Sequence, residues 1–164
     1  MALCEQSEYD GLINPDAPCF AAPASMTAAI KEYCLSTGQP APETPADYCR
    51  CIFRSLALRY RQVVEILQGM CDFPIRKLHV IGGGSQNRYL MQYAANALNM
   101  PVICGPVEGT ALGNVLMQMK ASDSSLTLEK MRAISADSVE LVTYQPVDAD
   151  KWNEEYKKFK NIVS

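Results

Sequence analysis

The chain has 164 residues, of which 48% are hydrophobic and 20% are charged, and its formal net charge is −3. This length and apolar content predict one domain with its own core, while a weakly acidic chain without a basic cluster is not expected to bind nucleic acid or an anionic membrane. No run of 18 or more apolar residues occurs, and acidic residues stand where a signal peptide carries lysine or arginine, so we expect a cytoplasmic protein.

Proline and asparagine turns predict an irregular lead-in over residues 1–24, followed by one domain over residues 25–164. Ser25 is a suitable N-cap for a short helix that ends at Gly38. A second helix start is indicated at Thr44, which is followed by proline at the first helical position and by an acidic residue at the third.

Apolar residues recur at helical spacing after this start, over about five turns and as far as Pro74, which predicts a long core helix. The residues at these core positions are Cys49, Ile52, Phe53, Leu56, Ala57, Tyr60, Val63, Val64 and Leu67.

Two strands are predicted at 77–81 and 101–104, with a weaker third near 139–143. A helix follows each of the first two strands, a short one lies around Leu128 to Ile134, and a last one begins near Asp148. The last helix carries an apolar stripe of core residues, namely Trp152, Tyr156, Phe159 and Val163. Parallel sheets are normally wide and covered on both faces, so a sheet of this size is predicted to be incomplete.

Three consecutive glycines, Gly82 to Gly84, end the first strand and lead into a helix that starts with Ser85, Gln86 and Asn87. A turn without Cβ atoms lets a ligand approach the backbone, and the start of the helix favours anionic or polar groups. The pattern is neither a P-loop nor a G-x-G-x-x-G fingerprint. Close packing of the helix on the strand is therefore an alternative explanation of the glycines, favoured on pattern alone.

Seven cysteines are scattered along the chain, an odd number that does not indicate a secreted disulfide framework. With one histidine and no C-x-x-C pair, a zinc site is poorly supported. We expect reduced, buried thiols, with a Cys34–Cys51 bridge as an alternative under oxidation. His79 lies in an apolar strand and is expected to be a hydrogen-bonded core residue.

The segment IGGGSQN, followed about twenty residues later by GPVEGTALGN, resembles the FGGY family of carbohydrate kinases. The likeness covers most of the chain and is strongest over residues 76–118. It implies an α/β fold, the helix-rich part of the second actin-like ATPase (ribonuclease H-like) domain, with an incomplete sheet whose missing strands would precede residue 1. The chain is then the carboxy-terminal, nucleotide-binding part of a kinase of several hundred residues.

The resemblance implies an ATP- and Mg²⁺-dependent enzyme that phosphorylates the 1-hydroxyl of L-rhamnulose, with another ketose or polyol as an alternative. It assigns the nucleotide contact to Gly82, Gly83, Gly84 and Asn87, the last through its amide; Gln86 has a weaker claim. No aspartate matches the family's catalytic base, so we assign no catalytic or metal-binding residue and expect the chain alone to be inactive.

The expected partners are ATP and ADP, and a sugar only together with the missing amino-terminal half. Self-association through the unfilled sheet edge is a further expectation. An actin-like assembly module without activity is one alternative function. An unrelated α/β enzyme is another, but no acid, base or nucleophile is recognised near the glycines to support it.

Overall fold

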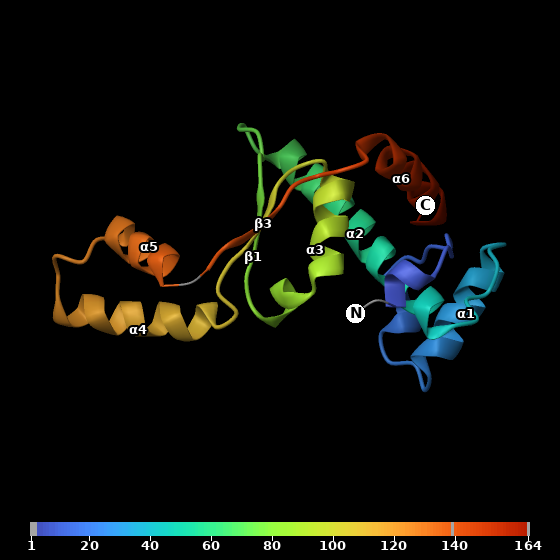
Figure 1. Ribbon diagram of the computed structural model, residues 1–164, viewed down its shortest axis with the longest axis horizontal. Helices are drawn as coiled ribbons and strands as arrows, with labels where there is room; N and C mark the ends of the chain where they lie inside the picture. Colours follow the sequence, from blue (N-terminus) through green and yellow to red (C-terminus); the bar gives the residue numbers. More distant parts are fainter. Residues whose placement is uncertain (1–2, 139, 164) are drawn as a thin grey trace.

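A small sheet lies at the centre of the chain, with helices at both ends, in a computed structural model that describes residues 3–138 and 140–163 (Figure 1). The elements follow the order η1 (Leu3–Gln6), η2 (Pro18–Phe20), α1 (Met26–Ser36), α2 (Pro45–Met70), β1 (Leu78–Val80), η3 (Gly83–Gln86), α3 (Arg88–Leu98), β2 (Val102–Cys104), α4 (Gly109–Ser122), α5 (Leu128–Asp137), β3 (Val142–Tyr144) and α6 (Ala149–Val163). The predicted helix-rich α/β class with a small sheet is confirmed.

The predicted helix starts are capped as the sequence indicated. The Ser25 side chain accepts a hydrogen bond from the N–H of Ala28 at the start of α1. Thr44 and Asp47 form a reciprocal capping box at the start of α2, with proline at the first helical position. Of the helices in the described ranges, none is long and apolar enough to cross a membrane.

The lead-in contains two 3-10 helices, and its connecting segment contributes to the core. Leu12 is completely buried and Ile13 nearly so. The N–H of Ile13 donates to the Ser55 hydroxyl in α2 over 2.9 Å, and Arg50 and Arg54 both donate to the carbonyl of Tyr9 over 2.9 Å. These bonds hold the lead-in against α2.

The sheet has three strands in the order β1-β2-β3. β1 and β2 are parallel, with Leu78 opposite Val102, and β3 runs antiparallel to β2. The strand expected at 139–143 is thus found as β3, although position 139 lies outside the described residues.

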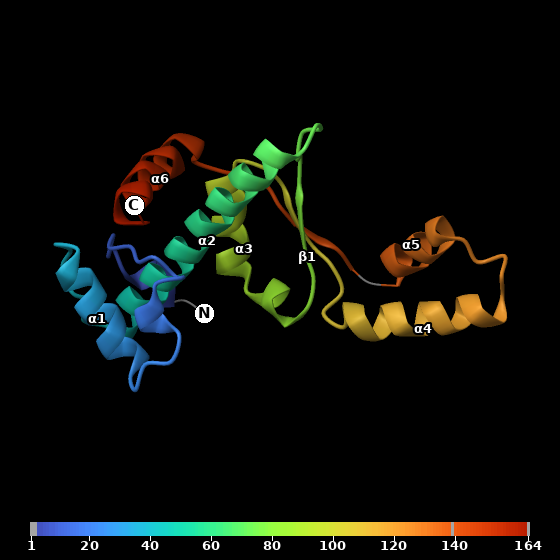
Figure 2. The same ribbon diagram turned by 180° about the vertical axis from the view of Figure 1, so that it is seen from behind.

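The main core lies between the sheet and the helices α2 and α3, and between these two helices and α6, which packs on their side away from the sheet (Figures 1 and 2). It contains the apolar face of α3 and the predicted stripe of α6. Its buried members are Leu12, Ala57, Leu58, Leu90, Met91, Ala94, Ala95, Ala97, Leu98, Val102, Cys104, Trp152, Tyr156 and Phe159.

A buried ion pair joins the helix at the chain's end to α2. Arg54 donates to the carboxylate of Glu155 in α6, and the two side chains are only 5% and 12% exposed. Lys158 lies 3.9 Å from the same carboxylate. The two residues are 101 positions apart in sequence, so the pair fixes α6 against a distant part of the chain.

Helices α4 and α5 form a hairpin that projects away from the main body (Figure 1). A small cluster of its own holds the hairpin together, with Leu116, Leu126 and Met131 buried. This cluster is separate from the main core.

Three residues expected in the core are exposed. Val63 and Leu67 in α2 are 39% and 46% exposed, and His79 in β1 is also exposed. Val63 and Leu67 border the open edge of the sheet beside β1, and His79 lies on the uncovered face of that strand. No further element of the described chain covers these positions. The apolar pattern was recognised correctly, but the burial inferred from it was wrong.

Candidate functional site

The two parallel strands β1 and β2 lead into neighbouring loops at the same end of the sheet. The N–H of Gly82, after β1, donates to the carbonyl of Pro106, after β2, over 3.1 Å. The N–H of Gly105 donates to the carbonyl of Val80 over 2.8 Å. In open α/β sheets ligands bind at this end of the strands, so the geometry makes these loops the natural position for a site.

Only one of the three consecutive glycines has a conformational reason to be glycine. Gly82 has φ +84°, a left-handed backbone that side chains avoid. Gly83 and Gly84 are exposed and have no such φ, and a Cβ atom added at either position would meet nothing within 4 Å.

Close packing therefore does not explain Gly83 and Gly84, and the alternative explanation favoured on pattern alone finds no support at these two positions. What the two glycines provide is an open stretch of backbone that a ligand can approach. The structure is compatible with the predicted ligand-binding role, which stays a prediction.

Ser85, to which the sequence analysis assigned no role of its own, fixes the shape of this turn. It is 6% exposed, and both its hydroxyl and its N–H donate to the carbonyl of Gly82, over 2.7 and 3.1 Å. The sequence predicted that a helix begins here at once. Instead, η3 comes first and α3 begins at Arg88, because these short bonds close a 3-10 turn. A hydroxyl residue directly after a glycine run was the available signal.

Asn87 is the N-cap of α3. Its side-chain oxygen accepts a hydrogen bond from the N–H of Leu90 over 3.1 Å. This capping bond uses only the oxygen of the amide. The two N–H groups of the amide can donate to a ligand, because no residue in the described ranges accepts a hydrogen bond from them. The capping role is thus observed, and the predicted nucleotide contact is compatible with it.

The turn from Gly82 to Asn87 therefore combines open backbone, a polar amide and the start of an eleven-residue helix. Such an arrangement can accept a ligand that carries polar or anionic groups, and the predicted nucleotide contact is compatible with it. Gln86 is exposed beside it. The four residues assigned from the sequence, Gly82, Gly83, Gly84 and Asn87, lie together in one turn.

The cysteines are all free, and four of the seven are buried. Cys34 and Cys51 are completely buried in one cluster, and a hydrogen bond from Cys51 lowers the pKa of the Cys34 thiol to about 6. The bonded partner and burial raise the pKa of Cys51. Cys19 is exposed, in contrast to the buried thiols expected throughout.

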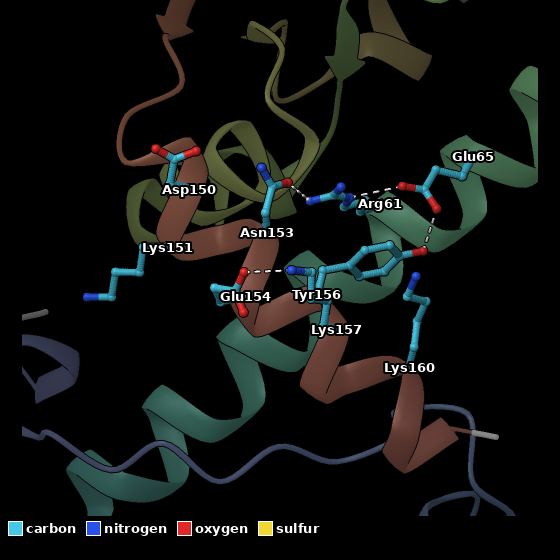
Figure 3. A pocket seen from close by; sticks show the side chains of 9 residues that line it. All are labelled: Arg61, Glu65, Asp150, Lys151, Asn153, Glu154, Tyr156, Lys157 and Lys160. Carbon is cyan, nitrogen blue, oxygen red and sulfur yellow. Dashed lines mark hydrogen bonds and ion pairs between the residues drawn. The ribbon is translucent and has the colours of Figure 1, made fainter.

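A hollow of about 680 Å³ between α2 and α6 shares no lining residue with the glycine turn (Figure 3). Several of its polar groups pair with one another: Arg61 bonds to Glu65 over 3.0 Å and to Asn153 over 2.8 Å, and Tyr156 donates to Glu65 over 2.6 Å. The guanidinium of Arg61 also lies 4.2 Å from the centre of the Tyr156 ring. Because these groups satisfy one another, they stabilise the packing of α6, and we assign no ligand to the hollow.

Comparison with known proteins adds a family to this geometry. Residues 5–122 match the C-terminal domain of the FGGY family of carbohydrate kinases. The rhamnulokinase of Bacteroides thetaiotaomicron is 50% identical over 155 residues, which are 94% of this chain and 32% of that protein. The rhamnulokinase of Pectobacterium atrosepticum is 42% identical over 154 residues, which are 94% of this chain and 31% of that protein.

Among solved structures, the xylulose kinase of Rhodospirillum rubrum has a similar fold, with a TM-score of 0.60 at 20% sequence identity. The match covers 77% of this chain and 26% of that one. The chain spans about a third of the length of the curated relatives named above.

Proposed function

The chain belongs to the FGGY family of carbohydrate kinases, and we propose that it supplies the nucleotide-binding part of an ATP-dependent sugar kinase. One observation carries the proposal: Gly83 and Gly84 are glycines although neither conformation nor packing requires it. A nucleotide lying against this backbone explains both positions. The Asn87 amide, held in place by its capping bond, donates to the adenosine portion.

The proposed sugar is L-rhamnulose, phosphorylated on its 1-hydroxyl. The support is the similarity to relatives named rhamnulokinase, which reaches 50% identity. Another ketose or a polyol is the alternative substrate. Phosphoryl transfer needs a bound sugar, a carboxylate that accepts the hydroxyl proton, and stabilisation of charge on the transferred group.

Mg²⁺-ATP supplies the transferred phosphoryl group. Within this chain, the glycine turn accepts the nucleotide, Ser85 holds the turn in shape, and Asn87 orients the adenosine. The metal is proposed to bind through the nucleotide's phosphates. The sugar pocket and the base are proposed to lie in the part of the kinase that the match leaves out, so this chain alone is expected to show no kinase activity.

An NMR titration with ATP, and separately with ADP, tests the nucleotide site. We expect saturable shifts centred on residues 82–87 in the wild type and their loss in Gly83→Val, which places a branched side chain where the nucleotide lies. Gly69→Val is the matched control, because Gly69 also has open space around a Cβ but lies near the end of α2. Both variants should keep the wild-type fold by circular dichroism.

Shifts that persist in Gly83→Val, or that centre elsewhere, would contradict the site. So would a folded chain that shows no shifts with millimolar ATP, both alone and after addition of the amino-terminal part of a rhamnulokinase.

A further inference from the structure

Ile81 joins β1 to the glycine turn, and its side chain lies against the loop that leads from β2 into α4 (Figure 1). The carbonyl of Val80, directly before it, accepts from the N–H of Gly105 over 2.8 Å. The N–H of Gly82, directly after it, donates to the carbonyl of Pro106 over 3.1 Å. The backbone of Ile81 is therefore bonded to this loop on both sides.

Two glycines, one in this loop and one at the start of α4, leave room for the Ile81 side chain. A Cβ atom added at Gly105 would lie 3.1 Å from Cγ2 of Ile81, closer than the optimal separation of about 3.5–4.0 Å between carbon atoms. A Cβ atom added at Gly109 would lie 3.5 Å from Cδ1, which is an ordinary contact. Neither glycine has a positive φ, so the backbone conformation does not require glycine at position 105. The space that Ile81 occupies does require it.

Hydrophobic burial does not explain the place of Ile81. The residue is 62% exposed and belongs to no hydrophobic cluster of the described chain. Its β-branched side chain has a restricted χ1, so Cγ2 cannot turn aside freely. A methyl group at Gly105 would therefore push on the backbone of Ile81 as well as on its side chain.

A displacement of Ile81 would pass directly to the proposed nucleotide site. Gly82 is the next residue, and its carbonyl accepts both hydrogen bonds with which Ser85 closes the 3-10 turn. The carbonyl of Gly84 accepts in turn from the N–H of Asn87 over 3.2 Å. The turn is thus one short bonded unit, and Ile81 determines where it stands relative to the loop after β2.

We propose that Ile81, held between Gly105 and Gly109, is a positioning residue for the nucleotide site, and that Gly105 lacks a side chain so that Ile81 can take this place. Ile81 acts through the turn that follows it and not on the reacting groups. This inference rests on the proposed function, because the turn that Ile81 positions is the proposed nucleotide site. It gives a role to both glycines of the segment GPVEG, residues 105–109.

The test measures the ATP affinity of this chain by NMR titration, from the amide shifts of residues 82–87. We expect Gly105→Ala to weaken ATP binding about threefold to tenfold, because the methyl group displaces Ile81 and with it the turn. Gly109→Ala is the matched control. It adds the same methyl group beside the same side chain, but at an ordinary contact distance, and should keep the wild-type affinity.

The variants Ile81→Ala and Ile81→Ala, Gly105→Ala complete a double-mutant cycle. Ile81→Ala alone should weaken ATP binding, because the turn loses the side chain that positions it. In this background Gly105→Ala should have no further effect, since the Cγ2 atom that it displaces is gone. Urea unfolding followed by the fluorescence of Trp152 should give the wild-type stability in every variant, because Ile81 lies outside the main core.

Nucleotide shifts in the wild type, together with equal ATP affinity in Gly105→Ala and Gly109→Ala, would overturn this inference and leave the nucleotide site in place. A further loss of about threefold or more on adding Gly105→Ala to Ile81→Ala would also overturn it, because the two positions would then act independently. A folded wild type whose residues 82–87 respond to ATP under none of the conditions given above would refute the nucleotide site itself, and the positioning role with it.

Discussion

Replacing Glu155 with leucine should destabilise the domain by about 3–5 kcal/mol, because Arg54 then keeps its charge in a buried position without a counter-ion. Arg54 is only 5% exposed in its side chain, so water cannot take over the role of the carboxylate. For a domain of this size, such a loss lowers the melting temperature by roughly 6 to 20 °C. It also removes a large part of a typical total stability of about 5–15 kcal/mol.

The double variant Arg54→Leu, Glu155→Leu should recover most of this loss, since it removes both charges and leaves side chains that can pack. The carbonyl of Tyr9, which accepts from Arg54, keeps its second donor in Arg50 at 2.9 Å. Urea unfolding followed by the fluorescence of Trp152, the only tryptophan, measures the stability of the wild type, the single variant and the double variant. Trp152 lies in α6 and is 6% exposed, so it reports the docking of that helix directly.

A cost below about 1 kcal/mol for Glu155→Leu would refute the reasoning, because that value is typical of a solvated surface pair. A double variant less stable than Glu155→Leu would refute it in another way, by showing that the charge on Arg54 is not what the single variant leaves uncompensated.

Two further predictions concern single side chains. Hydrogen bonds, the one with the largest effect from the Ser7 hydroxyl and the next from the N–H of Thr44, lower the pKa of the Asp47 carboxyl group to about 2. The carboxylate's contribution to stability is therefore complete above about pH 4 and is lost as the pH falls through 2, and Asp47→Ala should cost about 1 kcal/mol at pH 7 and little at pH 2. Urea unfolding across this pH range checks it, and an unchanged pH profile in the variant would contradict it. Burial, and then Glu65, raise the pKa of Tyr156 to about 12. Tyr156→Phe removes the hydroxyl that donates to Glu65 over 2.6 Å and should lower the free energy of unfolding by about 0.5–1.5 kcal/mol below pH 10. An absorbance titration of the tyrosines should then lack this high-pKa group. A titration identical to that of the wild type would count against the assignment.

Local signals in the sequence predicted the local structure well. The residue patterns at Ser25 and Thr44 identified helix starts that the structure contains, because capping depends on residues within one turn of each other. The three consecutive glycines and Asn87 were likewise located in one turn, since neighbours in sequence are neighbours in space there.

Features that depend on distant parts of the chain were missed. Nothing near His79 in sequence shows that one face of its strand is uncovered, and the apolar stripe of α2 looks the same whether or not it has a partner. The Arg54–Glu155 pair was also missed, because each residue considered alone is expected to be a solvent-exposed charged residue on a helix surface. The signal was present in the spacing: each stands within the apolar stripe of its own helix, between core residues.

The separate cluster of the α4–α5 hairpin has a consequence for cooperativity. Leu116, Leu126 and Met131 lose their contacts with one another when the hairpin opens, but no main-core side chain has to leave its place. We therefore expect local opening of the hairpin to require less free energy than global unfolding. Trp152 lies in the main core, so a transition recorded there reports the unfolding of that core and would not register a separate opening of the hairpin.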